Sequence, residues 1–158
     1  MRTLVIEDDS GDFGLIRAHL RMACTAHCDS LGQLLWAKTL AEGIAAGRSN
    51  KPDVVLLDLS LPDSAGLATV QAMHTALPGV PIVVLGERED EQVALQAVQR
   101  GAQDYLHKNF AGGALLARSV RYAVERRRAR DITLRLGRVV DASSSELYIF
   151  DADSLRFL

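Results

Sequence analysis

Acidic residues stand directly after two short apolar runs of the sequence. The segment EDD at residues 7–9 follows LVI at residues 4–6, and Asp58 follows VVLL at residues 54–57. Branched apolar runs of this length are typical of strands that are buried on both faces of a parallel sheet. Ligands bind such sheets at the carboxyl ends of the strands. If the two strands are neighbours, the acids converge on one spot, where they repel each other unless a pKa rises or a cation binds.

An all-oxygen cluster of this kind favours a hard ion such as Mg²⁺, which keeps several waters and bridges to phosphate. Lys108 follows a weaker apolar run and adds the positive charge that a phosphoryl group needs. The pattern predicts a metal-assisted phosphoryl acceptor with Asp58 as the nucleophile. Any single acid also fits a helix N-cap. Asp8, Asp9 or Ser10 could cap the first helix, and Asp63 or Ser64 could cap the third. The joint placement of several acids is what favours the metal site.

Five short apolar runs alternate with segments of helical spacing. Thr39 and Glu42 match a capping box at the start of the second helix. Strict alternation predicts parallel strands joined by right-handed crossovers, hence a doubly wound α/β domain. The last helical pattern begins after Gly113 and continues through a basic stretch to about Val140, which predicts a helix leading out of the domain. The predicted strands are residues 4–6, 34–37, 54–57, 81–85 and 104–107.

Length, composition and charge narrow the class of protein and the partners that it can have. The 158 residues suffice for one domain, or for one domain and a fragment of another, and 48% hydrophobic with 24% charged residues is the balance of a soluble globular protein. A net charge of -2 disfavours nucleic acid as a partner. The N-terminus matches neither a signal peptide nor a membrane span, so a cytoplasmic location without a membrane partner is expected. Cys24 and Cys28, with His19 and His27 nearby, lack a common zinc spacing and are expected to be reduced.

Four motifs together resemble the receiver domain of bacterial two-component response regulators, a CheY-like family. They are LVIEDD, DVVLLDLSLPDSAG, PIVVLGERED and GAQDYLHKNF, in register over roughly residues 2–130. The resemblance implies a flavodoxin-like fold, with a five-stranded parallel sheet in the order 2-1-3-4-5. It also implies that Asp58 accepts a phosphoryl group from a sensor histidine kinase or a phosphotransfer protein.

The resemblance implies a role for each residue of the site. Asp8 is the direct Mg²⁺ ligand of the acid pair, and Glu7 acts through water. Asp58 and the main-chain carbonyl of Ser60 complete the protein ligands, and Lys108 contacts the phosphoryl group. Self-phosphorylation and autodephosphorylation at Asp58 are the only catalysis expected of the chain itself.

Two positions depart from the family pattern. Gly86 stands where the family has Thr or Ser, whose hydroxyl couples phosphorylation to loop movement. Asn109 stands where the family has Pro after a cis peptide bond, so we expect a trans bond between Lys108 and Asn109. Tyr105 occupies the aromatic switch position, without its hydroxyl partner.

The sequence predicts a receiver domain over residues 1–125, a signalling helix over 126–142, and a further segment over 143–158. In that segment, LYIF at 147–150 and LRFL at 155–158 flank a turn and read as a hairpin that is cut off as its second strand begins. This pattern resembles the incomplete start of a PAS-like domain. The helix is expected to transmit the phosphorylation state through a homodimer to an output absent from these residues, a PAS-linked kinase or a diguanylate cyclase. The alternative is a degenerate receiver that acts as an interaction scaffold. A transcription factor is disfavoured because the residues after Arg130 are too few and too little basic for a helix-turn-helix domain. A metal-dependent phosphatase would use the same carboxylates, but nothing in the sequence marks a substrate pocket.

Overall fold

A computed structural model of the protein describes residues 1–24, 32–87, 90–108 and 113–142. Its centre is a parallel five-stranded sheet in the order β2-β1-β3-β6-β7, which confirms the predicted order 2-1-3-4-5. The strands span Thr3–Ile6 (β1), Leu34–Ala37 (β2), Val54–Asp58 (β3), Ile82–Gly86 (β6) and Asp104–His107 (β7). Each predicted strand is present, with bounds that differ by one residue at most.

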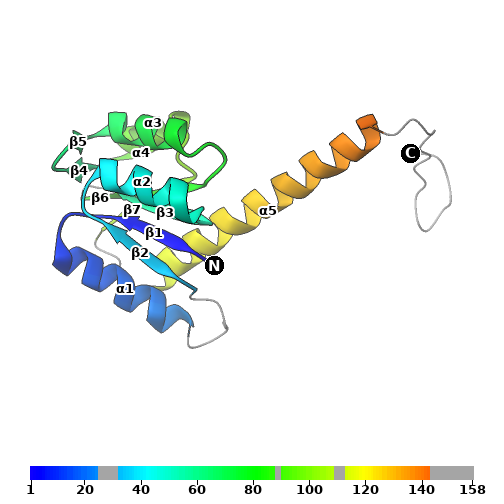
Figure 1. Ribbon diagram of the computed structural model, residues 1–158. Helices are drawn as coiled ribbons and strands as arrows, with labels where there is room; N and C mark the ends of the chain where they lie inside the picture. The colour runs from blue at the N-terminus through cyan, green and yellow to red at the C-terminus, as the bar shows by residue number, and fades with distance from the viewer. Residues whose placement is uncertain (25–31, 88–89, 109–112, 143–158) are drawn as a thin grey trace. The chain divides into compact units, whose positions relative to one another are not determined.

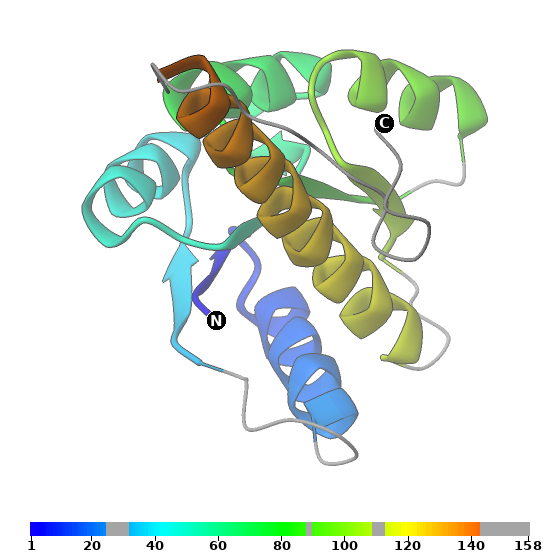
Figure 2. The same cartoon turned by 90° about the vertical axis from the view of Figure 1, so that its right-hand side faces the viewer.

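Helices cover both faces of the sheet (Figures 1 and 2). One apolar cluster lies between the sheet and the helices α2, α3 and α4, and the other lies between the sheet, α1 and the first turns of α5. The helices span Ser10–Cys24 (α1), Leu40–Asn50 (α2), Leu67–Ala76 (α3), Glu91–Gln99 (α4) and Ala114–Ala142 (α5). The structure is therefore the doubly wound α/β domain that the alternating pattern predicts.

The central strand β3 shows why its sequence is apolar throughout. Successive side chains of a strand point to opposite faces. Val55 and Leu57 pack into the cluster under α2 and α3, whereas Val54 and Leu56 pack into the cluster under α1 and α5. All four are fully buried. The same strand ends on Asp58, so the fold brings a carboxylate to the carboxyl edge of a completely covered sheet.

A small hairpin follows β3, which the sequence pattern does not predict. Its strands β4 (Ser60–Leu61) and β5 (Ser64–Ala65) pair antiparallel. Asp63, in the turn between them, accepts hydrogen bonds from the main-chain N–H groups of Leu40 (2.8 Å) and Ala41 (2.9 Å). It therefore caps α2 together with Thr39, whose hydroxyl accepts from the N–H of Glu42. The hairpin ties the segment after Asp58 to the start of α2.

This geometry corrects one sequence-based interpretation. Asp63 and Ser64 were candidate N-caps of the third helix, but the N-cap of α3 is Gly66, which has no side chain to cap it. The Asp63 carboxylate instead reaches a helix 23 residues earlier in the chain. The hydrogen bonds from the N–H groups of Ala41 and Leu40 hold the pKa of this carboxyl below its usual value.

Helix α5 runs without interruption from Ala114 to Ala142, which confirms the predicted long helix. Compact units within the chain are Met1–Arg127 and Arg128–Leu158. Within the first unit, the Arg127 guanidinium donates to the main-chain oxygen of Pro52 at 3.0 Å and so attaches the helix to the segment before β3. The predicted PAS-like segment lies outside the described residues, and the predicted boundaries at 125 and 142 stay predictions. Among the described residues, no helix is both long and apolar enough to cross a membrane.

Candidate functional site

Three carboxylates meet at the carboxyl edge of the sheet, where β1 and β3 end side by side. Ile6 pairs with Leu57 in the parallel register, so the next residues, Glu7 and Asp58, leave the sheet next to each other. One oxygen from each of Glu7, Asp8 and Asp58 lies within 4.8 Å of the others. Glu7 is fully buried and Asp58 is 2% exposed, whereas Asp8 is exposed to solvent. The acids that the sequence analysis singled out therefore form one cluster that is open at Asp8.

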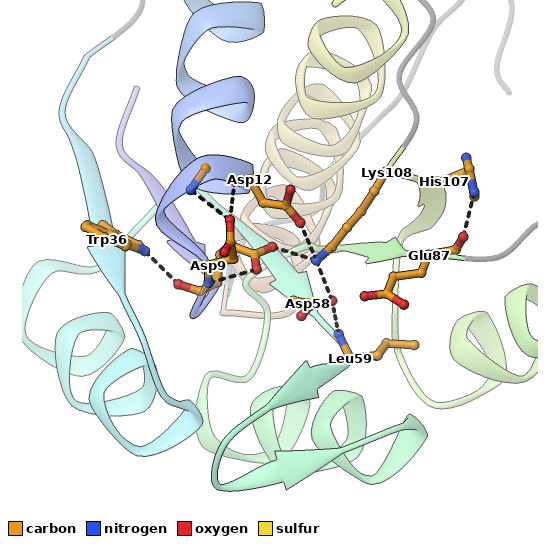
Figure 3. Close-up of polar contacts among 10 residues, drawn as sticks. Asp9, Asp12, Trp36, Asp58, Leu59, Glu87, His107 and Lys108 are labelled. Atoms are coloured by element: carbon orange, nitrogen blue, oxygen red, sulfur yellow. Dashed lines mark hydrogen bonds and ion pairs between the residues drawn. The ribbon is translucent and has the colours of Figure 1, made fainter.

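Lys108, the residue directly after β7, provides the counter-charge. Its Nζ lies 2.9 Å from Oε2 of Glu7, 3.2 Å from Oδ1 of Asp58 and 3.0 Å from Oδ2 of Asp12 (Figure 3). The Lys108 side chain is 14% exposed, so these ion pairs are screened less than surface pairs. Asp12, in the first turn of α1, was not among the predicted site residues. Acids are common near the N-terminus of a helix, so the sequence gives Asp12 no sign of a special role. Its contact is with Lys108, 96 residues later in the chain, and only the fold shows it.

For both Glu7 and Lys108, burial shifts the pKa in one direction and the oppositely charged neighbour shifts it in the other. Burial raises the pKa of Glu7, and the neighbouring charge of Asp58 raises it further, against the lowering effect of Lys108. Burial disfavours the Lys108 ammonium, but hydrogen bonds to Glu7 and Asp12 and the charge of Asp58 outweigh it and raise its pKa. The lysine therefore stays protonated, and burial disfavours the charge of Glu7 in the absence of a second cation.

Main-chain N–H groups fix the acids that line the site. Oδ1 of Asp9 accepts from the N–H groups of Gly11 (2.7 Å) and Asp12 (2.8 Å) and caps α1. Of the three consecutive acids, Asp9 therefore caps the helix, whereas Glu7 and Asp8 belong to the carboxylate cluster. Oδ1 of Asp58 accepts from the N–H of Leu59 at 2.8 Å, which orients the carboxylate at the end of β3.

At the switch position, the hydroxyl of Tyr105 takes up the space that a side chain on Gly86 would need. A Cβ built on Gly86 would lie 1.9 Å from the Tyr105 hydroxyl oxygen and 2.4 Å from Cζ. Tyr105 points inward against the apolar cluster under α3 and α4. Burial raises its pKa, and the charge of Asp90 at the start of α4 adds to the effect. The space beside Gly86 that a side chain would occupy is thus filled by the Tyr105 side chain.

The end of β6 and the residue after it are hydrogen-bonded to the end of β7 and to Lys108, which follows it. The N–H of Lys108 donates to the carbonyl of Gly86 at 2.7 Å. The Nε2 atom of His107 lies 2.7 Å from the carbonyl oxygen of Glu87 (Figure 3). Ser60, the predicted carbonyl ligand, opens β4 two residues after Asp58 and is exposed. The predicted trans bond at Asn109 lies outside the described residues.

The donor set suits Mg²⁺. Three carboxylate oxygens within 4.8 Å of one another are hard ligands, and two oxygens on opposite sides of one Mg²⁺ lie about 4 Å apart. The exposure of Asp8 leaves room for the waters that Mg²⁺ retains. The three carboxylates at this edge of the sheet therefore fit Mg²⁺.

Comparison with protein families identifies this arrangement. Residues 3–119 match the family model of the response regulator receiver domain. The chain belongs to that family. Receiver domains generally bind Mg²⁺ at an acidic pocket and interact with histidine kinases or phosphotransfer proteins, and this chain has a cluster of Glu7, Asp8 and Asp58 that could hold a metal ion.

Similar proteins include transcriptional regulators and isolated receiver domains. The chain is 32% identical to the KDP operon transcriptional regulatory protein KdpE of Escherichia coli (strain K12), covering 92% of this chain and 66% of the relative. It is 32% identical to the virulence transcriptional regulatory protein PhoP of Salmonella typhimurium (strain LT2), covering 75% and 50%. It therefore spans about half to two thirds of the length of these relatives. The receiver domain of NtrX from Brucella abortus superposes with a TM-score of 0.66 at 26% identity, covering 78% of this chain and 98% of that one.

Proposed function

We propose that this receiver domain accepts a phosphoryl group on Asp58 from a phosphohistidine of a sensor histidine kinase or a phosphotransfer protein, with Mg²⁺ bound. The observation that supports it most is the meeting of Glu7, Asp8, Asp58 and Lys108 at one sheet edge. A carboxylate oxygen of Asp58 attacks phosphorus, the P–N bond breaks, and the histidine imidazole leaves with the electron pair and takes a proton. The product is an aspartyl phosphate.

In this proposal each residue has a separate part. Asp8 and Asp58 would hold Mg²⁺ directly, Glu7 would act through a water molecule, and the main-chain carbonyl of Ser60 would complete the protein ligands. When bound, Mg²⁺ supplies positive charge to the phosphoryl oxygens. The Lys108 ammonium, 3.2 Å from Oδ1 of Asp58, compensates the negative charge that the phosphoryl group adds. Hydrolysis of the aspartyl phosphate by water returns the domain to its starting state.

Phosphate uptake tests the proposal. The protein incubated with Mg²⁺ and a small acyl phosphate donor should gain the mass of one phosphate, and removing Mg²⁺ with a chelator should slow the gain. Intact mass spectrometry measures both. Uptake that is equally fast without Mg²⁺ would contradict the role given to the carboxylate cluster.

The proposal also includes the kind of output domain that this receiver domain controls. The hairpin-like pattern at residues 147–158 supports a PAS-linked kinase or diguanylate cyclase, with α5 passing the state onward. The curated relatives favour a second candidate, since the proteins named KdpE and PhoP are transcriptional regulators. A cytoplasmic location is proposed with either output. The scaffold alternative is supported only by Gly86, and it predicts no phosphate uptake.

We further propose that α5 forms a homodimer. Two large apolar side chains of this helix, Leu115 and Tyr122, are seven residues apart, lie on one face and are exposed to solvent in the single chain. Burial of such a face at a helix pair favours association. Multi-angle light scattering at rising concentration should record a dimer, and Leu115→Glu with Tyr122→Glu should shift the equilibrium to the monomer. A wild-type chain that stays monomeric at high concentration would refute the dimer.

A further inference from the structure

Trp36, on the edge strand β2, contacts the main chain of the acidic site from outside the sheet. Its indole Nε1–H donates to the carbonyl oxygen of Glu7 at 2.7 Å (Figure 3). The N–H of Glu7 donates in turn to the carbonyl of Ala37, also on β2, at 3.0 Å. Both main-chain polar groups of Glu7 are therefore bound by β2, although Glu7 lies beyond the last paired residue of β1.

The bond to the Glu7 carbonyl fixes more than Glu7. A peptide unit is planar, so its carbonyl oxygen defines the orientation of the whole plane from one Cα atom to the next. The plane held by Trp36 joins Glu7 to Asp8, the two consecutive acids of the cluster. A rotation of this plane would move the Asp8 carboxylate relative to Glu7. The hydrogen bond from Trp36 therefore restrains the peptide plane that links the two acids.

The indole ring is itself held in place. The ring of Phe13, from α1, stacks parallel to it with centroids 4.4 Å apart and an interplanar angle of 2°. The Lys38 ammonium lies 4.9 Å from the ring centroid, within the range of a cation–π contact. Trp36 is 38% exposed, so burial alone does not explain a large aromatic side chain at this position. The stacking and the hydrogen bond together give it one defined orientation.

Other contacts fix the two ends of the Glu7–Asp9 segment. Lys108 and the N–H of Asp9 contact the Glu7 carboxylate, and the Asp9 carboxylate caps α1. These contacts define the two ends of the segment. Trp36 holds the plane between them.

We propose that Trp36 is a positioning residue for the cation site, which orients the Glu7–Asp8 peptide so that both carboxylates face one Mg²⁺. The inference rests on the proposed function, because it assumes that this cluster binds Mg²⁺. Residues that hydrogen-bond to the ligands of a metal and do not touch the metal itself change its affinity by about 10–100-fold when they are replaced. Trp36 acts through a main-chain carbonyl, so we expect an effect at the lower end of that range.

Calorimetric titration with Mg²⁺ tests the proposal. Trp36→Phe keeps an aromatic ring against Phe13 but removes the N–H donor, and it should weaken Mg²⁺ binding by about tenfold. Its unfolding temperature without Mg²⁺ should stay close to that of the wild type. Phe13→Leu keeps the donor and removes the stacking partner, so it should weaken binding by a smaller factor.

Val124→Ala serves as the control for a purely structural effect. Val124 is buried in α5, one turn before Arg127, which contacts the segment before β3 and not the carboxyl edge of the sheet. This variant should lose stability without losing Mg²⁺ affinity. If Trp36→Phe binds Mg²⁺ as tightly as the wild type, the positioning role is refuted while the proposed function stands. If the wild type binds no Mg²⁺, the proposed function fails as well.

Discussion

Replacing Lys108 by methionine should lower the free energy of unfolding in Mg²⁺-free buffer at neutral pH by about 3–5 kcal/mol, the cost of removing one partner from a buried ion pair. The Lys108 ammonium lies within 3.2 Å of oxygens of Glu7 and Asp58, which are both almost fully buried. Methionine fills a similar volume but leaves the two carboxylates facing each other without a counter-charge. Urea denaturation followed by circular dichroism measures the change.

The loss should depend on pH in a defined direction. The pKa of Glu7 is already raised by burial, and removal of the ammonium raises it further. A carboxyl whose folded pKa exceeds its unfolded value holds its proton more tightly in the folded state, so stability falls as pH rises above the ordinary value of 4.5. The Lys108→Met variant should therefore be closest to the wild type in mild acid and furthest from it at neutral pH.

Two further measurements show whether the lost charge is the cause. Mg²⁺ should stabilise Lys108→Met more than it stabilises the wild type, because the ion replaces the missing positive charge. Glu7→Gln should cost less in the Lys108→Met background than in the wild type, since the amide needs no counter-charge. A stability loss that is independent of pH, of Mg²⁺ and of Glu7→Gln would mean that Lys108 contributes by packing alone.

Restoring the family hydroxyl by Gly86→Thr should expel Tyr105 from its inward position and cost about 1–3 kcal/mol of stability, as overpacking of a filled site does. A Cβ on Gly86 would lie 1.9 Å from the tyrosine hydroxyl oxygen, so both side chains cannot occupy the site. The tyrosine is the side chain that can move, because its ring can turn outward about χ1. Its phenol then becomes exposed to water.

Titration of the tyrosines follows this movement. In the wild type the pKa of Tyr105 is raised by burial, and in Gly86→Thr it should fall toward the ordinary value of 10.0. Two-dimensional NMR of ring-labelled tyrosine measures it, and Tyr105→Phe assigns the signal. Gly86→Thr should also cost less when Tyr105 is already alanine. An unchanged Tyr105 titration in Gly86→Thr, or equal costs in both backgrounds, would show that the two residues do not compete for space.

The sequence is enough to predict the strands and to predict that the acids after them lie close together, because the carboxyl ends of parallel strands share one edge of the sheet. Glu7, Asp8 and Asp58 come together for this reason, and Lys108, directly after β7, joins them. The hairpin at Ser60–Ala65 is not predictable in the same way, since strands of two residues have no periodicity.

Contacts that depend on tertiary packing are also missing from the sequence pattern. Asp63 is a plausible cap for the helix that follows it, and only the fold shows that it caps α2. In the sequence, Trp36 is only an aromatic residue of a predicted strand, and its contact with Glu7 spans 29 residues. Asp12 is only an acid near the start of a helix, and its contact with Lys108 spans 96 residues. For Gly86 the sequence indicates a missing hydroxyl, whereas the structure shows that Tyr105 fills the space.

The most direct test of the account is to locate the phosphoryl group. The protein is incubated with Mg²⁺ and a small acyl phosphate donor, reduced with borohydride, which converts an aspartyl phosphate to homoserine, and digested for tandem mass spectrometry. We predict homoserine at position 58 and at no other acid, and none in Asp58→Asn treated in the same way. Unmodified Asp58 in a protein shown by calorimetry to bind Mg²⁺, or homoserine at Asp8 or Asp9 instead, would contradict the assignment of Asp58 as the phosphoryl acceptor.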